Sequence, residues 1–261
     1  MLLQRLLVAA VLLPIGLGAL FAGEIYFAVL MTVMITLAAK EYLEILRGGG
    51  LDPADFSLYG LVISAGFGVV LFREVDPLFY VAMFILAGTG YHLFKYEAGR
   101  DEALGDLVTT YAGILYLGVL GSHFLRIRVL ENGDWWMMVV FTAVWWADTG
   151  AYLIGSRFGK RLLSPRLSPK KTWEGYLGGL ACAVAGTPLM LLVYRQLGLP
   201  ADSEITISSA LVLGIAMGLF TVIGDLTISS LKRVFHLKDT GTILPGHGGM
   251  LDRIDSVSYT H

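Results

Sequence analysis

Eight long apolar runs constrain this fold more than any other feature of the sequence. A helix needs roughly 20 apolar residues to cross a bilayer, and its backbone polar groups must be satisfied within the segment. Charged residues make up 15% of the chain, well below the roughly 25% of soluble domains. We therefore predict an all-α, polytopic transmembrane helical bundle of about eight spans. The predicted spans are residues 6–22, 25–39, 56–72, 77–94, 107–125, 135–155, 173–194 and 205–224.

The positions of Lys and Arg predict which loops face the cytoplasm. With the N-terminus inside, 15 of the 19 basic residues fall on the cytoplasmic side and four fall outside. This asymmetry follows the positive-inside rule. It places the loop 156–172 and the tail after Asp225 in the cytoplasm. We expect an integral protein of the cell (inner) membrane whose chemically rich segments face the cytoplasm.

Composition also argues against other classes of protein. A net charge of −2 and the lack of a basic segment interleaved with aromatic residues argue against nucleic-acid binding. The single cysteine, Cys182, cannot form a disulfide within the chain. We expect a single integral membrane domain over residues 1–261. It would consist of N-terminal spans in 1–134, and of further spans, a cytoplasmic loop and a polar tail in 135–261.

The tail from Asp225 to Asp255 holds the richest chemistry. It contains four carboxylates, four Lys or Arg residues and two histidines directly after an apolar run. Ionisable groups are costly near hydrocarbon, so such a cluster indicates a function. Carboxylates bind Mg²⁺, basic side chains bind phosphate, and a glycine-rich turn lets amides approach an anion. The tail therefore predicts handling of a metal–polyphosphate substrate at the membrane surface.

Each of these features also has a simpler structural interpretation. Asp225 and Asp252 could be interfacial aspartates or a helix cap instead of metal ligands. The basic residues of the tail could only anchor the protein by the positive-inside rule. The turn Pro245–Gly249 could be a plain connection. Asp148 lies within a predicted span, where a carboxylate is either functional or satisfied by neighbouring helices.

Two blocks of the sequence carry long motifs with fixed spacing. The first block is Ser229-x-Leu231-Lys232-Arg233-x4-Lys238-Asp239-x-Gly241-x2-Leu244-Pro245-x-His247-Gly248-Gly249-Met250-x-Asp252-Arg253-Ile254-Asp255. The second block is Asp148-Thr-Gly-Ala-Tyr152, then Gly155-x-Arg157-x-Gly159-Lys160, then Ser168-Pro169-Lys170-Lys171-Thr172-x-Glu174-Gly175. Both blocks resemble the phosphatidate cytidylyltransferases, also called CDP-diacylglycerol synthases, and the first resembles the signature of that family. The resemblance is close over residues 148–255 and loose elsewhere.

This resemblance implies an enzyme that transfers CMP from CTP to phosphatidate, giving CDP-diacylglycerol and pyrophosphate in phospholipid biosynthesis. It implies Mg²⁺ as cofactor, with a second cation as an option. The implied partners are CTP, phosphatidate and the bilayer, with a homodimer as an option and no nucleic acid. The family usually continues past Asp255 into a further apolar segment, so a further C-terminal span is expected to be missing from this chain.

The resemblance also assigns roles to individual residues. Catalytic roles, chiefly phosphate contacts, go to Lys232, Arg233, Lys238, Asp239, His247 and Arg253. Substrate-binding roles go to Ser168, Lys170, Lys171, Gly246, Gly248 and Gly249. Metal-ligand roles go to Asp148, Asp225 and Asp252, while Asp239 and Asp255 are weaker candidates for ligands or for orienting a basic neighbour.

Two alternatives remain open at the level of sequence. A related enzyme could use another lipid phosphate or another nucleotide, as in CDP-archaeol synthesis. The chain could instead transport a cation or phosphate. Transport fits less well, because the charges cluster on one side of the membrane instead of lining a path at mid-bilayer, with the exception of Asp148.

Overall fold

The computed structural model describes residues 2–72, 75–241, 243 and 248–254, with side chains described for 10–72, 75–241, 243 and 248–252. The chain forms two compact units. The first unit comprises the chain up to Val129 together with Val234–Ile254. The second unit runs from Leu130 to Arg233. The predicted sites at Gly246, His247 and Asp255, and any further C-terminal span, lie outside the described residues.

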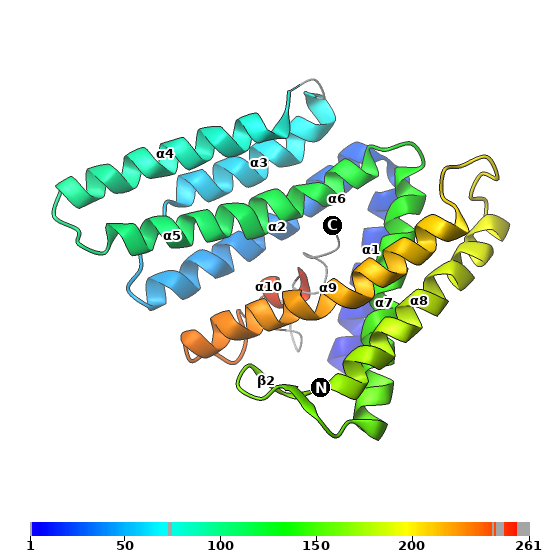
Figure 1. Cartoon of the computed structure of the whole chain (residues 1–261). Coiled ribbons are helices and arrows are strands. Elements are labelled where there is room, and N and C mark those ends of the chain that lie inside the picture. The colour runs from blue at the N-terminus through cyan, green and yellow to red at the C-terminus, as the bar shows by residue number, and fades with distance from the viewer. Residues whose placement is uncertain (1, 73–74, 242, 244–247, 255–261) are drawn as a thin grey trace. The chain divides into compact units, whose positions relative to one another are not determined.

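The first unit consists of helices packed around α2 (Figure 1). Helix α2 contacts α1, α3, α6 and α10, and its side chains Phe27, Leu43 and Leu46 are almost fully buried. The elements are α1 (Leu2–Ala22), α2 (Glu24–Gly48), α3 (Asp55–Leu71), α4 (Pro77–Glu97), α5 (Ala103–Gly113), the π-helical η1 (Ile114–Val119), α6 (Leu120–Arg128) and the short α10 (Leu251–Ile254).

Local sequence explains where some of these helices begin and end. The Asp76 carboxylate accepts a hydrogen bond from the Leu78 amide at 2.9 Å and so caps α4. Pro77 occupies the first helical position, where its missing N–H costs nothing. Helix α2 is followed by Gly50, whose φ of 85° lies in the left-handed region that favours glycine.

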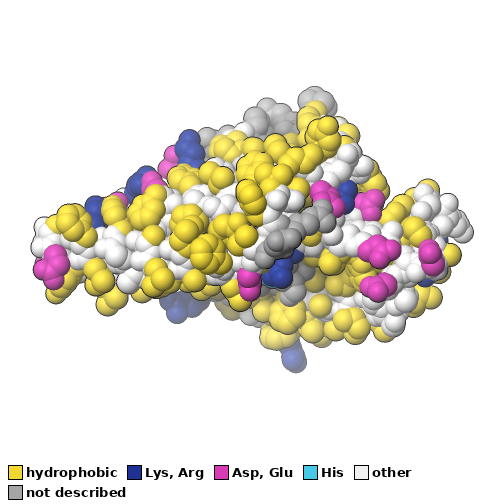
Figure 2. All heavy atoms as spheres, turned by 90° about the horizontal axis from the view of Figure 1, so that it is seen from above, with side chains coloured by type: hydrophobic (Ala, Val, Ile, Leu, Met, Phe, Trp, Pro, Cys, Tyr) yellow, Lys and Arg dark blue, Asp and Glu magenta, His cyan; other side chains and the backbone are white. Residues whose placement is uncertain are grey.

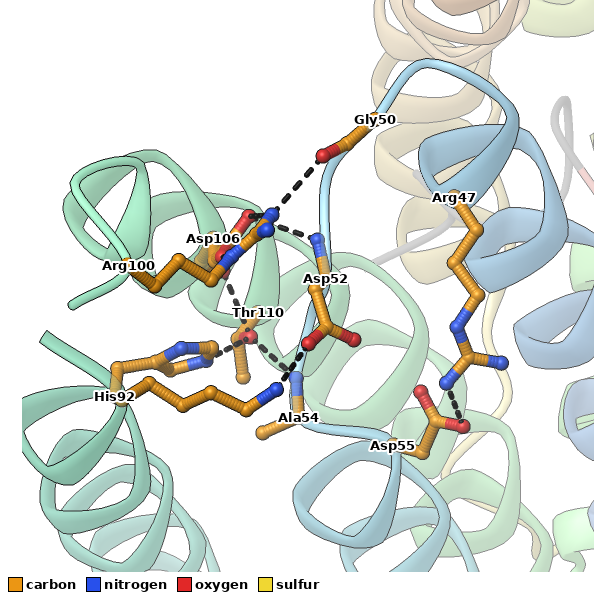
Figure 3. A network of polar contacts seen from close by, with 10 residues as sticks. Arg47, Gly50, Asp52, Ala54, Asp55, His92, Arg100, Asp106 and Thr110 are labelled. Carbon is orange, nitrogen blue, oxygen red and sulfur yellow. Dashed lines mark hydrogen bonds and ion pairs between the residues drawn. The ribbon is translucent and has the colours of Figure 1, made fainter. Parts of the chain in front are cut away.

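A polar network joins the α2–α3 connection to the facing ends of α4 and α5 (Figure 3). Asp106 is completely buried, pairs with Arg100, and accepts a hydrogen bond from the Asp52 amide at 2.8 Å. Lys95 from α4 pairs with the Asp52 carboxylate. Because a buried carboxylate must be compensated by such partners, this network fixes the ends of these helices against one another.

The second unit contains α7 (Gly133–Phe158), a β-hairpin of β1 (Leu162–Ser164) and β2 (Ser168–Thr172), α8 (Trp173–Gln196) and α9 (Ile207–Val234). Among the helices that the structure describes, α7 and α8 share the most extensive contact. A methyl group on Gly179 would lie 2.5 Å from the carbonyl oxygen of Ala147. Small residues therefore allow the two backbones to approach closely.

The helical class predicted from sequence is confirmed, since each of the eight apolar runs overlaps a helix. Among the described residues, five helices are long and apolar enough to cross a membrane, and these are Pro77–Glu97, Ala103–Arg128, Gly133–Phe158, Trp173–Gln196 and Ile207–Val234. The apolar helices at Ala10–Ala22 and Asp55–Leu71 are shorter. Helix length thus supports a membrane protein without establishing eight crossings.

Hydrophobic side chains cover much of the visible surface (Figure 2). Helix α4 shows this most clearly, because it buries only Gly88 and His92. Its Leu86 and Phe94 are 71% and 74% exposed. Long helices with outward apolar side chains are typical of proteins whose surrounding solvent is lipid.

Candidate functional site

A cavity of about 560 Å³ lies in the second unit between α7, α8, α9 and the β-hairpin. Two carboxylates and two lysines line it: Asp148 from α7, Asp225 from α9, and Lys170 and Lys171 from β2. Ser168 at the start of β2 lines it as well. Small residues form much of the remaining wall, namely Ala147, Ala151, Gly155, Gly175, Gly179 and Gly218. Small side chains at these positions leave room for a polyatomic ligand beside the charged groups.

The β-hairpin holds the two lysines beside this cavity. Thr172, the last residue of β2, caps α8, and its hydroxyl accepts a hydrogen bond from the Gly175 amide at 3.2 Å. The Glu174 carboxylate accepts hydrogen bonds from the amides of Lys160 at 3.0 Å and Arg161 at 3.1 Å. Both ends of the hairpin are therefore anchored on the first turn of α8.

The hairpin is absent from the sequence-based prediction. A polar segment with few alternating apolar residues gives little sign of a strand. The pairing places Leu162 opposite Thr172 and Ser164 opposite Ser168. Its anchors, such as Glu174, come from the following helix, and such tertiary contacts override local propensity.

Asp225 and Lys171 form an ion pair within the cavity. The Asp225 side chain is 34% exposed and the Lys171 side chain is 26% exposed. The Ser229 hydroxyl, one turn along α9, lies 3.3 Å from Asp225 Oδ1 and donates to it. Because both side chains line the cavity, a charged ligand bound there can replace either partner of this pair.

Asp148 faces the same cavity from α7. It follows the apolar residues Trp145, Trp146 and Ala147 within a helix long enough to span the membrane. A carboxylate there must face a polar cavity or a charged partner. The cavity with its two lysines provides that environment.

The tail residues that the structure describes lie in the first unit. Asp252 is 8% exposed, and its Oδ2 accepts hydrogen bonds from the Thr240 amide at 2.9 Å, the Thr240 hydroxyl at 3.0 Å and the Gly249 amide at 3.2 Å. These donors stabilise the ionised carboxylate. The Gly249 amide therefore already has a partner within the protein.

Glu41 is a functional candidate that sequence analysis misses. It lies on α2, is 1% exposed, and accepts hydrogen bonds from the amides of Met250 at 2.8 Å and Leu251 at 2.9 Å. Its Oε2 also lies 3.1 Å from the Thr240 hydroxyl, whose single hydrogen bonds either this oxygen or Asp252 Oδ2. The available signal was a carboxylate just past the predicted span 25–39, where an ionisable group lies close to hydrocarbon.

Some of the site residues predicted from the sequence lie together in the structure, and the others lie elsewhere. Asp148, Ser168, Lys170, Lys171 and Asp225 share the cavity of the second unit. Asp239, Gly248, Gly249 and Asp252 belong to the first unit, with the exposed Lys238. Lys232 and Arg233 lie in the last turn of α9, and Arg233 Nε donates to the Leu167 carbonyl at 3.4 Å. The Arg253 side chain, Gly246 and His247 are outside the described atoms.

Among the residues that the structure describes, no group of three or more His, Cys, Asp or Glu side chains is arranged to hold a metal ion. The two carboxylates of the cavity, Asp148 and Asp225, form a smaller set of hard oxygen donors. Such a set suits Mg²⁺, which is commonly held by one or two carboxylates together with substrate phosphates and waters.

Comparison with known proteins yields a consistent group of relatives. A model of the cytidylyltransferase family matches residues 3–261. A phosphatidate cytidylyltransferase from Synechocystis sp. is 30% identical, with 98% of this chain and 93% of the relative aligned. Phosphatidate cytidylyltransferases from Staphylococcus aureus and Staphylococcus haemolyticus are 30% and 31% identical, and each alignment covers 98% of this chain and 94% of the relative.

Proposed function

Since this chain belongs to the cytidylyltransferase family, we propose that it transfers CMP from CTP to phosphatidate, giving CDP-diacylglycerol and pyrophosphate for phospholipid biosynthesis. The observation that carries the proposal is the cavity of the second unit. Asp148 and Asp225 line it together with Lys170 and Lys171. Carboxylates and lysines in one open cavity are the groups that a metal–polyphosphate substrate requires.

The chemistry of the reaction explains why such a site suffices. An oxygen of the lipid phosphate attacks the α-phosphorus of CTP, and the bond from that phosphorus to the bridging oxygen breaks as pyrophosphate leaves. A phosphomonoester has its second pKa at about 6, so this nucleophile is already ionised at neutral pH. No side chain has to remove a proton. The protein's task is then positioning and charge stabilisation.

Basic residues supply the positive charge in this proposal. Lys170 and Lys171 bind phosphate within the cavity, with Ser168 as a hydrogen-bonding neighbour. A triphosphate carries roughly four negative charges, which calls for several fixed cations. The tail residues proposed to share this role are Lys232, Arg233, Lys238, His247 and Arg253.

Mg²⁺ is the cofactor that we expect at Asp148 and Asp225. Asp252 is likewise a proposed ligand of a cation, and a second cation is an option. When bound, Mg²⁺ supplies charge neutralisation at the reacting phosphates. Lys171 would then bind a substrate phosphate. Its ion pair with Asp225 would break, which leaves the Asp225 carboxylate available to the metal.

The proposal includes a setting in the membrane. All eight apolar segments would cross the inner membrane, and the cavity would face the cytoplasm, where CTP is available. The asymmetry of Lys and Arg supports this orientation, and the five long apolar helices support the membrane setting. A homodimer is compatible with this arrangement, and no nucleic acid takes part.

A purified-enzyme assay tests the function. The protein in detergent with Mg²⁺ is given CTP and phosphatidate, and pyrophosphate release is measured. We expect release only when both substrates are present, and less with ATP or GTP in place of CTP. Release with archaeol phosphate but not with phosphatidate would favour the related lipid enzyme. No release with any pair, combined with ion or phosphate flux in proteoliposomes, would favour the transporter.

A further inference from the structure

We propose that Glu41 is a positioning residue for CMP transfer. In this role, it holds the tail segment around Asp252 in the arrangement that the reaction requires. The inference rests on the proposed function, because Asp252 is there a ligand of the metal. Glu41 belongs to neither block of residues that resembles the family's motifs. It is separated from the tail by about two hundred residues, being 209 positions from Met250.

The contact is made by directional hydrogen bonds. Oε1 of Glu41 accepts from the Met250 amide at 2.8 Å, and Oε2 accepts from the Leu251 amide at 2.9 Å. Oε2 also lies 3.1 Å from the Thr240 hydroxyl. Both oxygens of one buried carboxylate are thus used, and α10 is held by its first turn against α2.

Two glycines of the tail make room for this carboxylate. A methyl group on Gly241 would lie 2.6 Å from Glu41 Oε1. A methyl group on Gly249 would collide with Glu41 Oε2 and with the Thr240 hydroxyl. Neither glycine has a positive φ, so close packing against Glu41 explains them better than backbone conformation.

Glu41 is linked to Asp252 by two short routes. The Thr240 hydroxyl lies 3.1 Å from Glu41 Oε2 and 3.0 Å from Asp252 Oδ2. Leu251, whose amide binds Glu41, directly precedes Asp252. A shift of the Glu41 contact therefore moves Asp252, and displacements of about 1 Å can cost roughly a hundredfold in rate.

A carboxylate is a costly way to hold two helices together, because apolar side chains would do so without desolvating a charge. What a carboxylate adds is direction. Two backbone amides that point at two oxygens, with the Thr240 hydroxyl beside one of them, fix the register of the segment as well as its proximity. A metal ligand such as Asp252 must be held at a defined position along the segment. Apolar packing alone would not fix that position.

The test compares Glu41→Gln with Glu44→Gln in the full-length protein. The first variant keeps the side chain's size, but its amide nitrogen must face at least one backbone N–H. The second lies one turn along the same helix with a side chain 62% exposed, and serves as the control. Amide hydrogen exchange at residues 249–252 is measured in detergent. The Mg²⁺ dependence of turnover is then measured for each variant.

We expect faster exchange of the Met250 and Leu251 amides in Glu41→Gln and a turnover about tenfold lower, as is common when a group that orients a metal ligand is lost. The Mg²⁺ concentration for half-maximal rate should rise. In an Asp252→Asn background, Glu41→Gln should add little further loss. Thr240→Ser should retain activity and Thr240→Val should reproduce part of the defect, which keeps the test usable if Glu41→Gln does not fold.

Unchanged exchange in Glu41→Gln would overturn the contact itself. Faster exchange with wild-type turnover and Mg²⁺ dependence would overturn the positioning role. Full additivity with Asp252→Asn would also overturn it, because the two residues would then act independently. A wild-type protein that forms no CDP-diacylglycerol would overturn the proposed function, and the exchange data would still report on the contact.

Discussion

Asp225 and Lys171 neutralise each other in the cavity, and each has a separate partner in the proposed reaction. In that proposal, phosphate would bind the lysine and Mg²⁺ would bind the carboxylate. Both side chains line the cavity, so each can reach a ligand bound there. At the scale of single residues, the proposed reaction therefore depends on the charge of Asp225 and on the geometry of Lys171. Each can be changed by a separate substitution.

Replacing the carboxylate tests the charge. Asp225→Asn keeps the shape but loses an anionic metal ligand, and we expect turnover to fall by roughly a hundredfold, or about 2.7 kcal/mol. Excess Mg²⁺ should recover part of the loss. Asp202→Asn, in the exposed connection between α8 and α9, should behave as wild type. Normal turnover of Asp225→Asn at low Mg²⁺ would remove Asp225 from the metal site.

Exchanging one cation for another tests the geometry. Lys171→Arg keeps the charge, but a planar guanidinium does not contact phosphate oxygens as a compact ammonium does. We expect turnover at saturating substrates to fall about tenfold, or roughly 1.4 kcal/mol. Lys40→Arg is the control, since the Lys40 side chain is 57% exposed and pairs with Glu44 on its own helix. Equal activity of both variants would mean that Lys171 acts merely as an anchor.

At the scale of elements, the apolar runs were enough to predict the long helices, because each run is longer than a typical strand and too apolar for a loop. The grouping of Asp148, Lys171 and Asp225 could be anticipated only through the resemblance of their motifs. The hairpin and the contact of Glu41 with the tail could not. Both depend on partners fixed by tertiary structure, and hydrophobic periodicity carries no information about such contacts.

Helix packing around the cavity gives a prediction at this scale. A methyl group on Gly179 would meet the backbone carbonyl oxygen of Ala147, which cannot move aside as the end of a flexible side chain could. Gly179→Ala should therefore destabilise the second unit by about 1–3 kcal/mol and reduce activity. Gly90→Ala in α4 meets nothing within 4 Å and should be neutral or slightly stabilising. Thermal unfolding in detergent compares them, and equal midpoints would contradict close α7–α8 packing.

At the scale of the whole molecule, the account requires the hairpin to lie in the cytoplasm. The chain is an integral membrane protein whose long helices present apolar side chains outward. Its orientation rests on the positive-inside rule. The exposed Arg166 lies in the turn between β1 and β2 and offers a place to test it.

Labelling of single cysteines tests this orientation in a Cys182→Ala background. Arg166→Cys should react with an impermeant thiol reagent only after the cells are permeabilised. Asp202→Cys, in the next connection along the chain, should react in intact spheroplasts. The reverse pattern would place the hairpin outside, away from CTP, and the topology would have to be inverted.

The most direct test of the central claim follows the phosphorus atoms of CTP. Purified protein with Mg²⁺ and phosphatidate is given CTP labelled at either the α- or the γ-phosphate. We expect the α-label to move into a lipid-soluble product and the γ-label to stay in water as pyrophosphate, with the formation of both products reduced about a hundredfold in Asp225→Asn. Transfer of the γ-label to lipid, or no transfer of the α-label by active-site-intact protein, would contradict it.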